Sequence, residues 1–164
     1  MKTATILFVV TSHAVMGDTG EKTGVWFEEL STPYYVFEDA GYNVKLASTA
    51  GGEIPIDPRS VAEDELPESV QRFKADSAAM QALKTTPSVE GLKAEDYAAV
   101  FLPGGHGTMW DLPKSDGLAK LLSNAYQAGK PVSAVCHGPV GLINATNARG
   151  EPIVKGKTVA AFTN

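Results

Sequence analysis

The feature that most constrains the fold is a regular alternation of short apolar runs with segments of helical periodicity. Apolar residues recur at spacings of three and four in 26–40 and 117–128, and a short helix is predicted over 139–145. Short strands separated by helices predict βαβ units, in which helices cover both faces of a parallel sheet. We therefore expect an α/β fold with a mainly parallel central sheet. The predicted strands are 5–11, 43–49, 99–102, 132–135 and 158–162.

The length of 164 residues is typical of one domain, and we treat residues 1–164 as a single α/β domain. Residues 49–94 do not fit a minimal α/β domain, so we interpret them as an insertion between the second and third strands. The insertion is expected to carry a helix within 68–84 and to act as surface elaboration, an interface or a lid. Pro33 lies inside the first predicted helix and is expected to kink or divide it.

Composition excludes several classes of partner. The net charge is -5, the pI is about 5.2 and the basic residues are scattered, which argues against a nucleic-acid or anionic-membrane partner. No apolar segment approaches the roughly 20 residues that a membrane-spanning helix needs. The single cysteine cannot form an internal disulfide, and a free thiol favours a cytoplasmic location.

The single cysteine lies where a parallel sheet places its ligands. Ligands bind outside the carboxyl ends of the strands, and Cys136 follows the apolar run 132–135 and precedes a predicted helix. A tight turn there would expose the thiol as a nucleophile, and a helix N-terminus would favour the thiolate. His137 could then donate a hydrogen bond or move a proton. From these residues alone, a buried structural cysteine stays an alternative.

Two further stretches could complete a site. The glycines at 104, 105 and 107 follow the 99–102 strand and could present N–H groups to an oxyanion, although a plain connector turn would look the same. Glu28 and Glu29 are adjacent at a helix start, so at most one of them points toward the site. The histidines 13, 106 and 137 all follow predicted strands, but they lack the spacing of a metal motif, so no metal is predicted.

Taken together, "TGVWFEEL", "PGGHGTMWDLP" and "AVCHGP" resemble the ThiJ/PfpI superfamily, which has a glutamine amidotransferase-like fold. The resemblance extends over essentially the whole chain and is closest to the branch of glutathione-independent glyoxalases (glyoxalase III) and related holding chaperones. It implies a flavodoxin-like α/β sandwich with Cys136 as a nucleophile on an elbow. It further implies His137 and Glu29 as catalytic partners, with Gly105 and the backbone at His137 as oxyanion-binding donors.

The resemblance also implies an activity. Cys136 would add to the aldehyde of methylglyoxal, and the hemithioacetal would rearrange and hydrolyse to lactate without a metal or organic cofactor, in protection against stress. The implied partners are a small aldehyde substrate and a second copy of the chain in a homodimer. Two alternatives stay open: a ThiJ/PfpI-type hydrolase (peptidase, deglycase or amidotransferase-like), or a stress-induced holding chaperone.

The end of the sequence leads to a further prediction. The predicted strand 158–162 stops two residues before Asn164, whereas the superfamily continues with further strands and a helix. We therefore expect the domain to lack its C-terminal portion, including an acidic partner for His137. A second polypeptide carrying that portion is then an expected partner.

Overall fold

The computed structural model describes residues 3–62 and 64–162, and its centre is a four-stranded, all-parallel sheet. The strands are β1 (Thr5–Val10), β2 (Asn43–Ser48), β3 (Ala99–Leu102) and β4 (Val132–Ala134), in the spatial order β2-β1-β3-β4. The predicted α/β class and these four strands are confirmed, each strand to within one residue at either end.

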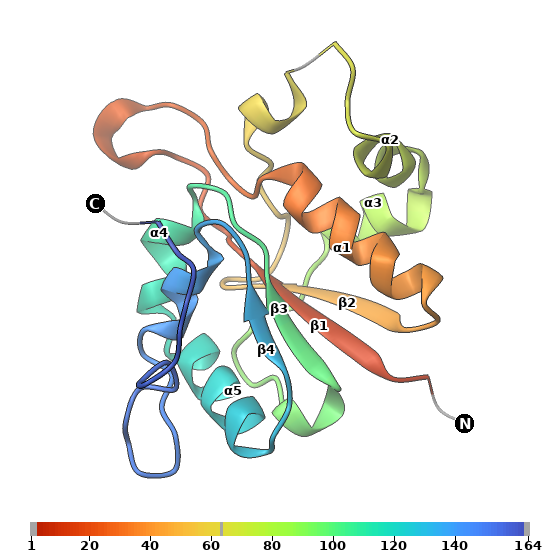
Figure 1. The fold of residues 1–164 in the computed structure, drawn as a ribbon. Coiled ribbons are helices and arrows are strands. Elements are labelled where there is room, and N and C mark those ends of the chain that lie inside the picture. Colours follow the sequence, from red (N-terminus) through yellow and green to blue (C-terminus); the bar gives the residue numbers. More distant parts are fainter. Residues whose placement is uncertain (1–2, 63, 163–164) are drawn as a thin grey trace.

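Helices cover both faces of the sheet (Figure 1). One face carries α1 (Phe27–Asp39), α2 (Glu68–Ala75) and α3 (Ser77–Lys84), and the other carries α4 (Thr108–Asp111) and α5 (Asp116–Gln127). The alternation of side chains along β1 supplies both cores. Phe8 and Val10 pack in the cluster that contains α1, and Leu7 and Val9 pack in the cluster that contains α5. This two-sided burial explains why β1 is an uninterrupted apolar run.

The first helix is not divided at Pro33. The α1 helix continues through this residue to Asp39, although proline cannot donate to the carbonyl of Glu29 one turn earlier. Leu30 and Tyr34 on the buried side hold the helix against the sheet. Packing of this apolar face therefore outweighs the one lost hydrogen bond.

The segment between β2 and β3 contributes side chains to the core. Val70 and Phe73 from α2, and Leu83 from α3, are buried in the cluster that contains α1. The single helix predicted within 68–84 is two helices. They part at Asp76, whose carboxylate caps α3 by accepting hydrogen bonds from the N–H groups of Ala78 and Ala79.

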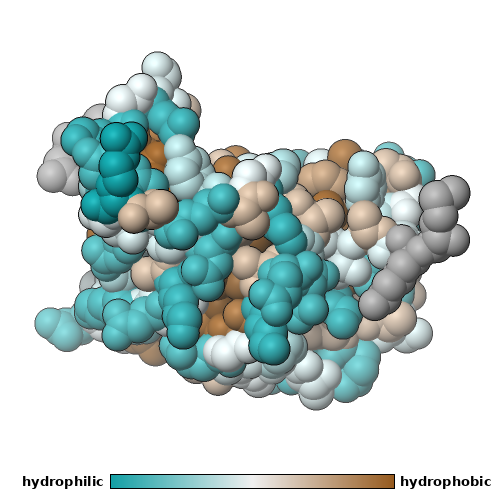
Figure 2. Space-filling view, turned by 90° about the horizontal axis from the view of Figure 1, so that it is seen from below, coloured by the Kyte–Doolittle hydropathy of each residue, from teal (hydrophilic) through white to brown (hydrophobic). Residues whose placement is uncertain are grey.

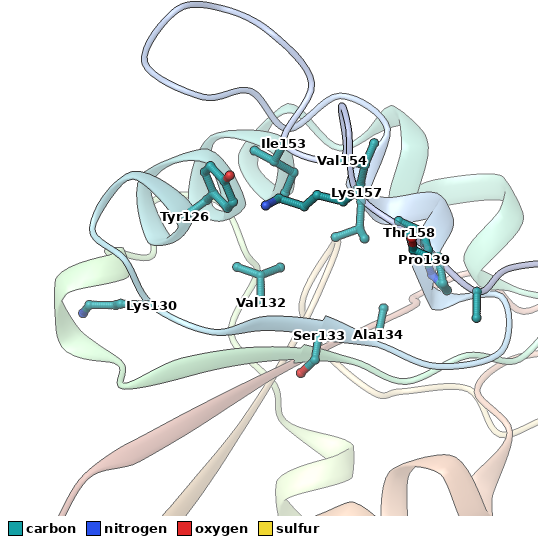
Figure 3. A pocket seen from close by; sticks show the side chains of 13 residues that line it. Tyr126, Lys130, Val132, Ser133, Ala134, Pro139, Ile153, Val154, Lys157 and Thr158 are labelled. Carbon is teal, nitrogen blue, oxygen red and sulfur yellow. The ribbon is translucent and has the colours of Figure 1, made fainter.

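The predicted strand over 158–162 is wrong, because these residues are exposed and form no β-ladder in the described part of the chain. Figure 3 shows Val132 and Ala134 of β4 pointing toward the segment that carries Val154 and Thr158, whereas Ser133 points the other way. The segment thus lies over one face of β4 and not beside its edge. A hollow of about 460 Å³ separates the two. Only a segment beside the edge of β4 could form hydrogen bonds with the backbone N–H and C=O groups of that strand.

The surface is consistent with the composition. Viewed from below, the molecule is mostly hydrophilic, with hydrophobic residues visible in a recess between hydrophilic groups (Figure 2). None of the helices in the described ranges is both long enough and apolar enough to cross a membrane.

Candidate active site

The backbone at Cys136 adopts a conformation that few side chains tolerate. Its φ of 57° is the only positive value among the described residues other than glycine. The strained turn connects β4 to the 3₁₀ helix η5 (Gly138–Leu142). Gly138 permits this turn, because a Cβ atom at position 138 would lie 2.4 Å from the carbonyl oxygen of Leu102. The elbow geometry predicted from the sequence is confirmed.

Glu29 reaches this elbow from the first turn of α1. Its Oε2 accepts a hydrogen bond of 2.9 Å from the N–H of Gly104, at the exit of β3. A Cβ on Gly104 would lie 2.5 Å from that oxygen and 2.7 Å from the Cβ of Cys136. Only glycine therefore lets the carboxylate and the cysteine approach each other here. Glu28 is exposed, so one of the two glutamates faces the site, as predicted.

Four groups surround the sulfur of Cys136. The Glu29 carboxyl group and the backbone N–H groups of Gly105 and His137 lie close enough to the sulfur to shift the pKa of the thiol. The Nδ1 atom of His137 lies 3.1 Å from Sγ. Gly105 has a φ of 95°, and a Cβ there would lie 2.3 Å from the carbonyl oxygen of Gly24. The site thus brings together all four residues predicted from the sequence: Glu29, Gly105, Cys136 and His137.

The surroundings of Cys136 act on the pKa of its thiol in both directions. Burial raises the pKa of Cys136, and the neighbouring Glu29 raises it further, although the N–H groups of Gly105 and His137 act in the opposite direction. The helix that follows is a 3₁₀ helix of five residues, too short to supply a strong helix dipole. The net effect is a raised pKa, which favours the protonated thiol, so a nearby base assists its activation.

The pKa values of the two nearby proton carriers, Glu29 and His137, are shifted as well. Burial raises the pKa of Glu29, and the hydrogen bonds from Cys136 and Gly104 only partly offset this effect. Burial lowers the pKa of His137, and the neighbouring His106 lowers it further. These shifts bring the carboxylate and the imidazole closer together in proton affinity, which suits proton transfer between them and a bound substrate.

The three histidines do not form a common cluster. The His137 ring packs against the ring of His106, with centroids 4.7 Å apart, and against that of Phe162, with centroids 4.4 Å apart. His13 instead stacks on Trp110. Across residues 3–62 and 64–162, no group of three or more His, Cys, Asp or Glu side chains could hold a metal ion.

The cysteine is accessible from a mostly apolar hollow. Its volume is about 460 Å³, and Met109, Ile143 and Phe162 line it together with Cys136 and His137. Its lining matches the usual character of a small-molecule site, in which apolar walls surround a few polar groups.

Sequence reasoning missed Asp57 and Arg59, which extend the polar network to His106. Asp57 accepts a hydrogen bond from the N–H of Arg59 at the start of a 3₁₀ helix, and this local turn could have been predicted from "DPRS". The contact of Arg59 with His106 could not have been predicted in this way, because 47 positions separate the two residues.

We expect iodoacetamide to alkylate Cys136 slowly at neutral pH and faster as the pH rises. Only the thiolate reacts, and the pKa of the Cys136 thiol is raised. In Glu29→Gln the carboxylate charge is gone, so the pKa of the thiol falls and alkylation at a given pH becomes faster. The rate of alkylation against pH measures both effects. A wild-type midpoint below about 8.5, the ordinary pKa of cysteine, would contradict this account.

Comparison with known proteins shows what the chain is similar to. The model of the DJ-1/PfpI family matches residues 22–161. Glyoxalase 3 of Candida albicans is 37% identical over 163 residues, covering 97% of this chain and 69% of that protein. The glutathione-independent glyoxalase hsp3102 of Schizosaccharomyces pombe is 36% identical over 151 residues, covering 87% of this chain and 61% of that protein. The chain thus spans about two thirds of the length of these relatives.

A solved structure agrees with these sequence matches. The Rapid Encystment Protein 24 kDa of Francisella tularensis superposes with a TM-score of 0.92 at 38% identity, over 99% of this chain and 71% of that one. The similarity therefore covers the sheet, the helices on both faces and the elbow.

Proposed function

This chain belongs to the DJ-1/PfpI family, and on that basis we propose that its site converts methylglyoxal to lactate without glutathione. The observation that carries the proposal is the close approach of the Glu29 carboxyl group and Cys136 to each other across Gly104. Relatives that bear the names glyoxalase 3 and glutathione-independent glyoxalase add support. Their names favour this activity over the hydrolase and chaperone alternatives.

The first step is addition of the thiol to the aldehyde. Glu29 takes the proton from Sγ as the sulfur bonds to the aldehyde carbon, and the C=O π bond opens. The N–H groups of Gly105 and His137 lie near the sulfur, so they lie close to the oxyanion that forms on the adjacent carbon. Return of the proton to that oxygen gives a hemithioacetal.

The second step moves protons between the two oxygenated carbons. The aldehyde-derived C–H is acidic because it adjoins the ketone, and Glu29 removes it as the ketone oxygen is protonated, which gives an enediol. Protonation of the former ketone carbon and loss of the hydroxyl proton from the sulfur-bearing carbon give a 2-hydroxyacyl thioester. His137, beside the sulfur, is the second proton carrier. The rearrangement is an internal redox isomerisation, so it needs no external oxidant or reductant.

The third step releases the product. Water attacks the thioester carbon, the C–S bond breaks, and the proton lost by water returns to sulfur. The sum is methylglyoxal plus water giving lactate, with the thiol regenerated. Each proton that moves has a carrier in contact with Cys136, either the Glu29 carboxylate or the His137 imidazole.

The experiment is incubation of the purified protein with methylglyoxal and no added thiol, with lactate measured over time. We expect lactate to form in proportion to enzyme concentration. Lactate at the uncatalysed background, from folded protein with a reactive Cys136, would rule out this activity.

The other properties implied by the family resemblance stay predictions. These are a homodimer, a cytoplasmic location, and a stress-protective role with accompanying chaperone activity. Light scattering that gives a mass near 17.3 kDa would contradict the dimer.

A further inference from the structure

A short piece of the β2–β3 connection is fixed against the start of α1. The N–H of Val25 donates to the carbonyl of Pro55 at 2.9 Å, and the N–H of Asp57 donates to the carbonyl of Val25 at 3.0 Å. Gly24 permits this approach, because a Cβ there would lie 2.1 Å from the Pro55 oxygen. The connection is thereby anchored two residues before the helix that supplies Glu29.

Asp57 is fully buried at this anchor, and its carboxylate has a complete set of donors. Oδ2 accepts from the hydroxyl of Thr23 at 2.9 Å and from Nη2 of Arg59, and Oδ1 accepts from the N–H and the Nε of Arg59. Burial alone would raise the pKa of Asp57, but these hydrogen bonds outweigh it and lower the pKa. The two-point contact fixes the plane and direction of the guanidinium.

The same guanidinium extends to the catalytic side. Nη2 of Arg59 lies 3.1 Å from Nδ1 of His106. Arginine has only donors, so Nδ1 of His106 is the acceptor in this contact, and the tautomer that fits it carries its proton on Nε2. The charged groups that face Arg59 are Asp57 and Glu21, and both stabilise the guanidinium cation that makes this contact.

His106 in turn packs on the residue that touches the nucleophile. Its ring is tilted by 40° against the His137 ring, and Nδ1 of His137 lies 3.1 Å from Sγ of Cys136. A continuous set of contacts therefore runs from the buried Asp57 through Arg59, His106 and His137 to the thiol.

We propose that Arg59 is a positioning residue, which holds His106 in the tautomer protonated on Nε2 and thereby fixes the His137 ring beside Cys136. The connection between β2 and β3 then contributes to the site as well as to the core. The structural part of this inference is independent of the reaction, and its kinetic part rests on the proposed glyoxalase function.

The test compares Arg59→Lys with Arg72→Lys. Lysine keeps the positive charge beside Asp57 but cannot contact Asp57 at two points and His106 at once. Arg72 forms a similar two-point pair with Asp39, on the outer helices α1 and α2, and is the matched control. Long-range ¹H–¹⁵N spectra of the ¹⁵N-labelled protein report the histidine tautomers, with His106 assigned from a His106→Asn variant.

We expect wild type and Arg72→Lys to show His106 protonated on Nε2, and Arg59→Lys to show a mixture of both tautomers. We also expect kcat of Arg59→Lys to fall by about tenfold, with KM and the unfolding temperature little changed. An unaltered His106 tautomer in Arg59→Lys, or an altered tautomer with unaltered kcat, would overturn the proposal.

A second variant covers the case in which Arg59→Lys does not fold. The double variant Asp57→Asn/Arg59→Gln replaces the ion pair with neutral groups, so it leaves no buried charge unpaired, and the same tautomer change is expected. Because the spectra do not depend on turnover, a wild-type protein that makes no lactate but shows the Nε2–H tautomer would contradict the proposed function and leave the assignment of Arg59 standing.

Discussion

Replacing Cys136 with serine is expected to reduce the conversion of methylglyoxal by at least about 10³-fold, the scale on which loss of a covalent nucleophile acts. A serine hydroxyl is far harder to ionise than a thiol, and Glu29 is too weak a base to activate it. The fold should tolerate the change, because serine is close in size to cysteine and the side chain is only half-buried. We expect the free energy of unfolding to change by less than about 1 kcal/mol.

The measurement is initial lactate formation, with thermal unfolding of the same samples as the control for folding. Wild-type protein alkylated at Cys136, the single cysteine, gives a second sample in which only the thiol is blocked. Turnover of Cys136→Ser within tenfold of wild type would show that the reaction does not pass through a bond to sulfur.

Replacing Glu29 with glutamine is expected to have the next largest effect, a loss of about 10²- to 10⁴-fold in kcat, because the variant has no carboxylate to move protons. The glutamine oxygen can still accept the hydrogen bond from Gly104. Burial raises the pKa of Glu29, so its ionised form costs folding free energy as the pH rises through that pKa. The variant should therefore be at least as stable as wild type at neutral pH.

Glu28→Gln is the matched control, because it removes the same charge one position away on the exposed side of α1. We expect near wild-type turnover from this control. The acidic limb of the pH–rate profile should be present in wild type and Glu28→Gln, and weak or missing in Glu29→Gln. Equal losses in the two variants would mean that net charge, and not the carboxylate at the site, determines the rate.

The sheet could be predicted from the sequence because its strands carry a local signal. Residues 6–10 are buried on both faces, so they are apolar without interruption, and such a run is recognisable without knowledge of its neighbours. The segment 158–162 has similar composition but became a wrong prediction. A strand needs a neighbouring edge at hydrogen-bonding distance, and this segment lies over a face of β4. That relation is set by the rest of the fold and not by the five residues.

The features of the site also differ in whether a local sequence signal predicts them. Cys136 and its elbow follow from the order of strand, cysteine and glycine, which is local. The raised pKa of the thiol does not follow from local sequence, because it depends on burial and on Glu29, more than a hundred positions earlier. The contact of Arg59 with His106 is equally non-local. Sequence reasoning thus identified Cys136, Glu29 and His137, and it missed the direction of the thiol pKa shift and the contact of Arg59 with His106.

The sheet order has a consequence for how the molecule folds. The central strand β1 pairs with β3, so residues 6 and 99 must meet, and β4 can add only to an edge that β3 has already formed. Pairings between such distant residues are slow to form. Glu29 comes from a helix that packs on the sheet early in the chain, but its partner Cys136 arrives only with β4. During refolding, recovery of catalysis should therefore lag behind recovery of helical circular dichroism, which makes the active site a reporter of the last strand to join.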